Sequence, residues 1–244
     1  MKYDYLLAFG DSTTAGCELI PDSTDWGETK KLSFPNQLAN KLNIPCINFA
    51  MPGSSNDRSL RLLPEALLKY PNSLVLFTYT VFDRTEFFTA DDLIPQDDTG
   101  YTGVGINWKS VKSNNKHQNL NNLYLKYFYN NTNEYNRYKS YNMLLMVQLL
   151  CKQYAKHFLE IFLYDQLLLP PDYQALVYEQ IDKSHIFSFD YARVDSNWQT
   201  NNEAHGSLQQ WAKRSNYDFC PGGHIGQQAH DTFAIELYNH LCMA

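Results

Sequence analysis

Apolar segments alternate with helix-like patterns along the first third of the chain. Residues 5–9 are an apolar run, and residues 46–50 and 74–80 are mostly apolar segments, all of the length that buried strands have. Between them, residues 33–42 and 60–68 place apolar side chains at the spacing of a helix that buries one face. Because strands that alternate with helices tend to pair in parallel, the chain is expected to form a parallel sheet with helices on both faces.

The remainder of the chain continues this pattern with longer gaps. The spacing predicts a long helix within residues 118–156, a fourth strand over 158–164, a helix over 174–181, a fifth short strand at 186–189 and a last helix over 226–241. The expected fold class is therefore α/β, a three-layer sandwich around a central parallel sheet of about five strands.

The chain shows no internal repeat and no low-complexity linker, so residues 1–244 are expected to form a single domain. Residues 89–117 are rich in Asp, Gly, Asn, Ser and Lys, a composition typical of a long surface loop. We therefore expect an insertion there, and loops of this kind commonly contact substrates.

The charge and the apolar content restrict the partners. The formal net charge is −6, from 20 basic and 26 acidic residues, which argues against nucleic acid because its binding needs a basic surface. No apolar run approaches the ~20 residues that span a bilayer, and the first residues lack the apolar stretch of a signal peptide. A cytoplasmic location is expected, and the abundance of Asn, Lys and Tyr leaves a virion-associated location open.

The five cysteines are scattered and form no C-x-x-C pair, so they are expected to be reduced. No metal and no cofactor are expected. The oligomeric state is left open by the sequence.

The turn after the first predicted strand carries a serine. A serine hydroxyl becomes a nucleophile when it lies on a rigid exposed turn beside a base, with donors for the oxyanion that forms. Ser12 follows Gly10 and Asp11 directly after residues 5–9. Because open α/β sheets bind ligands at the carboxyl ends of their strands, Ser12 is the candidate nucleophile.

Two further turns carry residues that suit the same chemistry. A Pro-Gly turn containing Gly53 follows the second predicted strand, and Asn56 suits the cap of the next helix. His224 lies in a glycine-rich turn before the last predicted helix, which suits a general base that projects into a cleft. His230 falls inside that helix and is expected to be structural, because a spacing of six residues does not place it on one helix face with His224 as a metal pair.

These turns resemble the sequence blocks of the GDSL/SGNH hydrolases. Residues 10–16, Gly-Asp-Ser-Thr-Thr-Ala-Gly, resemble the first block, in which the serine is the nucleophile. Residues 48–56 resemble the second block, whose glycine N–H enters the oxyanion hole, and residues 223–234 resemble the last block, whose histidine is the general base. The resemblance implies an SGNH-hydrolase-like, flavodoxin-like fold.

The resemblance also implies roles for individual residues. Ser12 would be the nucleophile, His224 the base, and the backbone N–H groups of Ser12 and Gly53 the oxyanion donors. The family's aspartate three residues before the base is replaced here by Pro221, and Asp218 is the nearest candidate to orient the histidine. A Ser-His dyad with a backbone carbonyl as the orienting group is the alternative.

The third block departs from the family as well. The family ends its third strand with an asparagine that donates to the oxyanion, and the corresponding segment here contains none. Asn56 and Thr80 are the candidates to replace that donor. Arg84 is a candidate to bind an anionic part of a substrate, although a salt-bridge cluster with Asp83 and Glu86 that holds a loop is slightly favoured.

The expected function is that of a GDSL/SGNH-type esterase that removes small acyl groups such as acetyl from a carbohydrate or a lipid-like ester. Its substrate would be a small ester or an acylated glycan. The alternative, motivated by the altered third block and the missing aspartate, is a catalytically weak or inactive module on the same scaffold that binds glycans, such as a phage structural protein. A nucleotide-binding domain is disfavoured because the chain lacks G-x-G-x-x-G and G-K-[ST].

Overall fold

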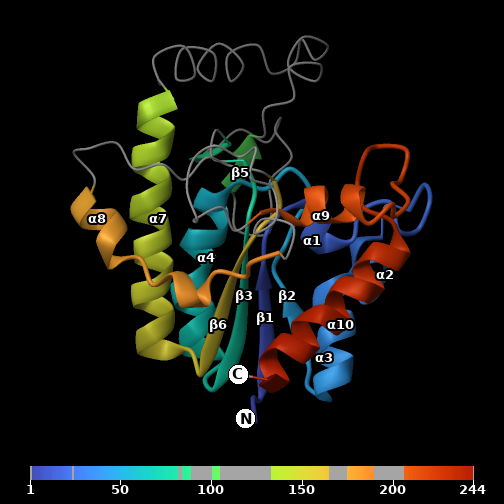
Figure 1. Cartoon of the computed structure of the whole chain (residues 1–244), viewed down its shortest axis with the longest axis horizontal. Coiled ribbons are helices and arrows are strands. Elements are labelled where there is room, and N and C mark those ends of the chain that lie inside the picture. The colour runs from blue at the N-terminus through green and yellow to red at the C-terminus, as the bar shows by residue number, and fades with distance from the viewer. Residues whose placement is uncertain are drawn as a thin grey trace.

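The computed structural model describes residues 2–23, 25–81, 84–88, 101–104, 133–164, 175–189 and 206–243. Its centre is a parallel sheet of four strands in the order β2-β1-β3-β6 (Figure 1). The strands are β1 (Tyr5–Phe9), β2 (Cys46–Asn48), β3 (Ser73–Tyr79) and β6 (His157–Phe162). The predicted α/β class with a central parallel sheet is confirmed.

Residues 186–189, which the sequence predicts as a fifth strand, contribute a single bridge. Ile186 forms an isolated parallel bridge with Glu160 of β6, and the Phe187 N–H donates to the Glu160 carbonyl at 2.8 Å. The bridge directly follows a 3₁₀ turn, η3 (Lys183–His185), so the chain meets the sheet edge only briefly. The sheet in the described part of the chain therefore has four strands.

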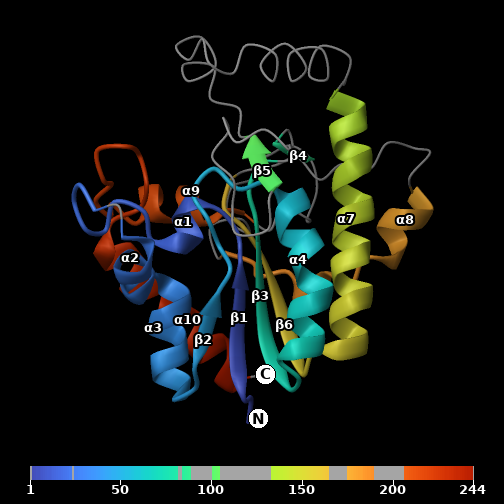
Figure 2. The same ribbon diagram turned by 180° about the vertical axis from the view of Figure 1, so that it is seen from behind.

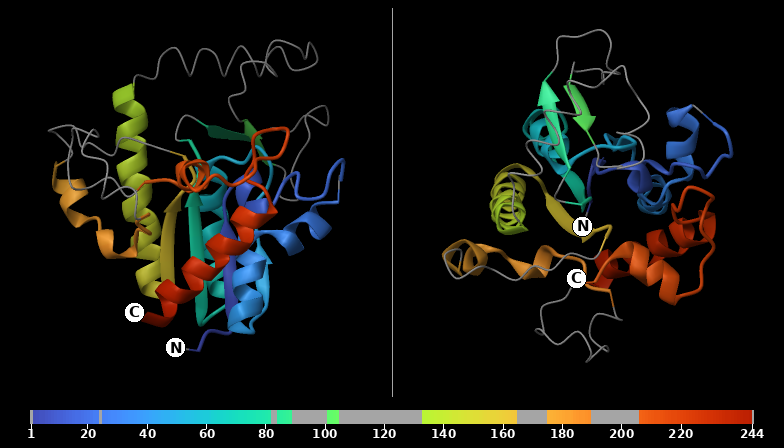
Figure 3. Two further views of the ribbon diagram at one scale, coloured as in Figure 1. Left: turned by 45° about the vertical axis from the view of Figure 1, so that its right-hand side comes forward. Right: turned by 90° about the horizontal axis from the view of Figure 1, so that it is seen from above.

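Helices cover both faces of the sheet (Figure 2). On one face lie α3 (Phe34–Leu42), α9 (Leu208–Arg214) and α10 (Gln227–Met243), and on the other lie α4 (Asn56–Lys69) and α7 (Asn133–Tyr154). The view from above shows α4 and α7 on the opposite side of the sheet from α10 (Figure 3). The molecule thus has the three layers that the sequence predicts.

The central strand β1 shows why its sequence is continuously apolar. Leu6 and Ala8 pack in the core beneath α3 and α10, whereas Leu7 and Phe9 pack in the core beneath α4 and α7. All of these side chains are completely buried. A parallel strand that is covered on both faces has no solvent-facing positions, so apolar and polar residues do not alternate along it.

The remaining elements are short. They are α1 (Ser12–Ala15), α2 (Trp26–Leu32), α8 (Ala175–Gln180), β4 (Thr85–Phe88) and β5 (Tyr101–Val104). β4 and β5 form a separate antiparallel pair. Apart from β5, the predicted insertion over 89–117 lies outside the described residues, and so does the first part of the predicted helix over 118–156. No helix in the described part of the chain has the length and apolar character that crossing a membrane requires.

Candidate active site

The position of β1 in the sheet defines where a ligand would bind. β1 lies between β2 and β3, so the chain passes to opposite sides of β1 after its first two strands. The connection to β2 carries α3 on one face, and the connection to β3 carries α4 on the other face. Such a topological switch point forms the crevice in which open α/β sheets bind ligands. The segments that follow β1, β2 and β3 therefore line the candidate site.

Ser12 is the first residue of α1, directly after the turn that ends β1. The Asp11 carboxylate caps α1 and accepts from the Thr13 N–H at 3.0 Å. A glycine is required at position 10 because a Cβ atom on Gly10 would overlap the Thr78 hydroxyl of β3. Ser12 is 8% exposed, and its hydroxyl makes no hydrogen bond within the described residues. The backbone of Ser12 is thus held on a rigid turn, and in the described part of the chain no hydrogen bond joins its hydroxyl to His224.

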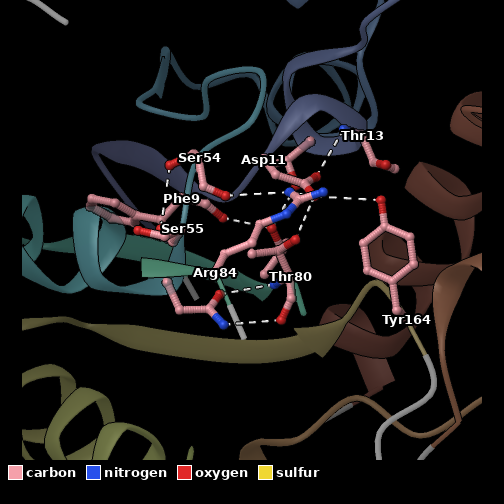
Figure 4. A network of polar contacts seen from close by, with 11 residues as sticks. Phe9, Asp11, Thr13, Ser54, Ser55, Thr80, Arg84 and Tyr164 are labelled. Atoms are coloured by element: carbon pink, nitrogen blue, oxygen red, sulfur yellow. Dashed lines mark hydrogen bonds and ion pairs between the residues drawn. The ribbon is translucent and has the colours of Figure 1, made fainter. Parts of the chain in front are cut away.

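The Asp11 carboxylate is the centre of a polar network next to Ser12 (Figure 4). The side chain is completely buried, and Oδ2 accepts from the Thr80 hydroxyl at 2.7 Å and from Arg84 Nη1 at 2.9 Å. The Tyr164 hydroxyl points at the same oxygen from 3.5 Å. Burial, followed by the charge of Asp11, raises the pKa of Tyr164, so the hydroxyl keeps its proton and acts as a donor.

Arg84 joins the segments that follow β1, β2 and β3. Its Nη1, which contacts Asp11, also donates to the Ser54 carbonyl at 3.4 Å. Of the partners predicted for Arg84, Asp83 and the side chain of Glu86 lie outside the described residues. The guanidinium therefore balances the charge of a buried carboxylate beside the candidate nucleophile.

Asn56 fixes the end of β3 against the start of α4. Its Nδ2 donates to the Thr80 carbonyl at 3.0 Å, and its Oδ1 accepts from the Thr80 N–H at 2.9 Å. The second amide hydrogen of Asn56 is left for another acceptor. Gly53, in the turn before α4, has a φ of 71°, a left-handed conformation that favours glycine. The roles of Gly53 and Asn56 as oxyanion donors stay predictions.

His224 lies in the loop before α10, and a carboxylate contacts its ring. The His224 Nδ1 atom lies 2.7 Å from Glu18 Oε2. The Cys220 N–H donates to the His224 carbonyl at 2.8 Å, which closes the loop around the histidine. The loop before α10 therefore packs on the segment that follows α1 (Figure 3). The sequence alone does not reveal Glu18, because this contact spans 206 positions and a glutamate in a loop has no distinguishing pattern.

Asp218, the acid predicted from the sequence, is held through its backbone. Its carbonyl accepts from the Gly226 N–H at 2.8 Å. Within the described residues, no hydrogen bond joins the Asp218 carboxylate to His224. The structure thus brings His224 together with Glu18, and the role of Asp218 as the acid stays a sequence prediction.

His230 occupies the interior of α10 and is completely buried. Its Nδ1 accepts from the Phe34 N–H at the start of α3, at 3.0 Å. Burial lowers the pKa of His230 to about 3, so the ring is neutral and acts as a hydrogen-bond acceptor between two helices. The described residues hold no group of three or more side chains that could share a metal ion.

Comparison with known proteins finds similar structures. No protein-family model and no curated protein sequence match the chain. The structure is similar to that of the psychrotrophic esterase EstA from Pseudoalteromonas sp., with 14% identity over 98% of this chain and 97% of that chain and a TM-score of 0.43. For the acetyl xylan esterase Est2A from the rumen bacterium Butyrivibrio proteoclasticus, the identity is 13% over 99% of this chain and 64% of that chain, with a TM-score of 0.47. For a lipolytic protein of the G-D-S-L family from Desulfitobacterium hafniense, the identity is 12% over 97% of this chain and 98% of that chain, with a TM-score of 0.39.

Two of these similar structures are esterases, and the third is a lipolytic protein of the G-D-S-L family. The similarity is one of fold. At identities of 12–14% and TM-scores below 0.5, it gives no information about the activity or the substrate of this chain.

Proposed function

We propose that the protein is a serine ester hydrolase that removes small acyl groups, such as acetyl, from a carbohydrate or a lipid-like ester. The observation that carries this proposal is the position of Ser12. The residue begins α1 at the topological switch point of the sheet, and its hydroxyl has no hydrogen-bond partner among the described residues. A nucleophilic serine needs such a fixed position together with a base within reach. No hydrogen bond joins Ser12 to His224 among the described residues, so the approach of the base is part of the proposal.

In the proposed reaction, His224 accepts the proton of the Ser12 hydroxyl at Nε2, and Ser12 Oγ forms a bond to the ester carbonyl carbon. The carbonyl oxygen becomes an oxyanion, for which the N–H groups of Ser12 and Gly53 would be the donors, with the second amide hydrogen of Asn56 as a third. The alcohol leaves with the proton from His224. Water, deprotonated by the same histidine, then releases the acid and restores Ser12.

The ion pair of Asp11 and Arg84 supports this chemistry. An unpaired carboxylate beside Ser12 would oppose the negative charge that develops in the tetrahedral intermediate. Arg84 Nη1 lies 2.9 Å from the Asp11 carboxylate, and the arginine side chain is only 17% exposed, so the two charges balance each other with little screening by solvent.

The first test is labelling with a fluorophosphonate probe together with hydrolysis of p-nitrophenyl acetate. We expect the wild-type protein to be labelled and to release p-nitrophenol, and Ser12→Ala to do neither while it stays folded. Ser215→Ala, which changes an exposed serine at the end of α9, is the matched control and should behave like the wild type. Labelling of Ser12→Ala to the wild-type extent would disprove the assignment of the nucleophile.

A glycan-binding module on the same scaffold is the second candidate function. The observation that favours it concerns Asn56, one of whose two amide hydrogens is donated to the Thr80 carbonyl, so that only the other is left for an oxyanion. Under this alternative, folded wild-type protein resists the fluorophosphonate probe but binds acetylated oligosaccharides in titration calorimetry. Labelling of Ser12 together with turnover of the ester excludes it.

A further inference from the structure

The carboxylate of Glu18 makes two hydrogen bonds with the loop that carries His224. Oε2 lies 2.7 Å from His224 Nδ1, and the same oxygen accepts from the Gly222 N–H at 3.1 Å. The second contact comes from the same loop as the first, so the carboxylate is fixed relative to the imidazole. The side chains of Glu18 and His224 are 33% and 23% exposed, so the pair is largely covered.

The backbone conformation of Glu18 and the glycine that faces it both accommodate the contact between Glu18 and the His224 loop. Glu18 has a φ of 68°, in the left-handed region that residues other than glycine rarely adopt. Gly222 faces the glutamate without a side chain, because a Cβ atom at position 222 would overlap the Glu18 carboxylate. The Glu18 carbonyl also accepts from Cys220 Sγ at 3.6 Å. Strained conformations of this kind persist where the surrounding structure determines them, and they cluster at functional sites.

We propose that Glu18, in place of Asp218, is the positioning residue for His224 in ester hydrolysis, an inference that rests on the proposed function. The Nδ1–H of His224 donates to the Glu18 carboxylate. Nε2 is then unprotonated, which is the state that can accept the proton of Ser12. After the transfer, the carboxylate stabilises the imidazolium and does not itself take the proton.

The proposal places the nucleophile and the orienting acid in one short segment. Glu18 follows Ser12 by six positions. Between them, Gly16 caps the end of α1 in the left-handed conformation, and the Cys17 N–H donates to the Ser12 carbonyl at 2.9 Å. A rigid turn therefore fixes the distance between the serine and the acid, and the acid in turn holds the base.

Kinetics of four variants test the proposal with p-nitrophenyl acetate as substrate. Glu18→Ala is expected to lower kcat on the order of 10²–10⁴-fold with little change in KM, because the loss of an orienting acid removes the reactive tautomer. Glu18→Asp keeps a carboxylate and should recover part of that loss. Asp218→Asn should lose far less activity than Glu18→Ala. Glu28→Ala, which removes an exposed glutamate of α2, is the matched control with wild-type kcat.

A nitrogen-15 NMR spectrum of histidine-labelled protein reads the tautomer without any substrate. The His224 signals are identified by their absence from His224→Gln. In the wild type we expect a protonated Nδ1, and in Glu18→Ala a mixture of both tautomers, with unchanged thermal stability. The spectroscopic change separates a positioning role from a merely structural one.

Wild-type kcat in Glu18→Ala, a larger loss in Asp218→Asn, or an unchanged His224 tautomer in Glu18→Ala would each overturn the proposal. The proposal is also overturned if Glu18→Ala loses activity because it unfolds and Glu18→Asp does not recover that activity. If the wild type neither binds the fluorophosphonate probe nor cleaves esters, the proposed function fails. The tautomer measurement then still decides whether Glu18 orients the ring.

Discussion

The Arg84 guanidinium and the Asp11 carboxylate form an ion pair of 2.9 Å that joins the segments after β3 and β1. The carboxylate has no exposed surface, and the arginine side chain is 17% exposed. When one partner of such a buried pair is removed, the other stays unpaired in a poorly solvated position. The pair is therefore a point at which the fold and the proposed chemistry depend on the same two residues.

Arg84→Met is expected to lower the free energy of unfolding by about 3–5 kcal/mol, measured by chemical denaturation. The double variant Asp11→Asn/Arg84→Met should recover part of this loss, because no charge is then left unpaired. Lys31→Met, which breaks the exposed pair with Glu28, should leave the denaturation midpoint near that of the wild type. Equal losses in Arg84→Met and Lys31→Met would show that Asp11 gains nothing from the arginine.

Glu160 predicts a pH dependence of stability. Its carboxylate is completely buried in β6 and accepts from the Tyr79 hydroxyl at 2.5 Å and from Gln148 Nε2 at 2.6 Å. Burial is the largest effect and raises the pKa of Glu160 from 4.5 to about 7. The folded protein thus binds this proton more tightly than the unfolded chain. The stability that the folded protein gains from the raised pKa of Glu160 is fully present below about pH 4.5. It is lost as the pH rises through about 7.

Glu160→Gln has no proton to lose, so we expect it to gain stability relative to the wild type as the pH rises. The difference in unfolding free energy should change by about 3 kcal/mol across this window, because each pKa unit corresponds to about 1.4 kcal/mol. Denaturation curves at a series of pH values measure it. A difference that stays constant with pH would mean that the Glu160 pKa is not raised.

The contribution of His230 to stability changes with pH in the opposite direction. Burial lowers its pKa from 6.5 to about 3, so between these values the unfolded chain binds a proton that the folded protein does not. Its contribution to stability is present above about pH 6.5 and is lost as the pH falls toward 3. His230→Gln keeps an acceptor for the Phe34 N–H and removes the titration. We expect the wild type to lose about 4–5 kcal/mol more than this variant on acidification; parallel denaturation profiles would contradict the expectation.

Gly10→Ala is expected to destabilise the protein by about 1–3 kcal/mol, because the added methyl group overlaps the Thr78 hydroxyl and the turn must shift. Since Ser12 lies on that turn, labelling by the fluorophosphonate probe should also become slower. At Gly223, an added Cβ meets no atom within 4 Å, so Gly223→Ala reports the strain of a positive φ alone, about 1 kcal/mol. Thermal unfolding compares the two variants, and a smaller loss for Gly10→Ala would contradict the proposed overlap.

The buried strands could be predicted from the sequence because their burial is uniform. Every residue of β3 is buried, so a mostly apolar segment identifies it. The short helices α1, α2 and α9 are not predicted, because four to seven residues rarely show a clear periodicity, although α8, with six residues, is predicted. Residues 186–189 have strand-like composition, but they form a single bridge, because the preceding 3₁₀ turn η3 determines where they meet β6.

The candidate site could be predicted where local sequence fixes it. Ser12 and His224 occupy turns whose neighbours, glycines among them, mark the position along the chain. The partners of these residues depend instead on tertiary packing. Glu18 meets His224 across 206 positions, and Arg84 meets Asp11 across 73, so neither pairing leaves a local pattern to recognise.

The long separation of Glu18 and His224 also fixes the order in which the site can be assembled. β2, β3 and β6 are all synthesised after Glu18 and before His224. A growing polypeptide therefore carries Ser12 and its turn for most of its synthesis without the imidazole that would activate the hydroxyl. Under the proposed function, ester cleavage is withheld from every chain that has not yet reached His224.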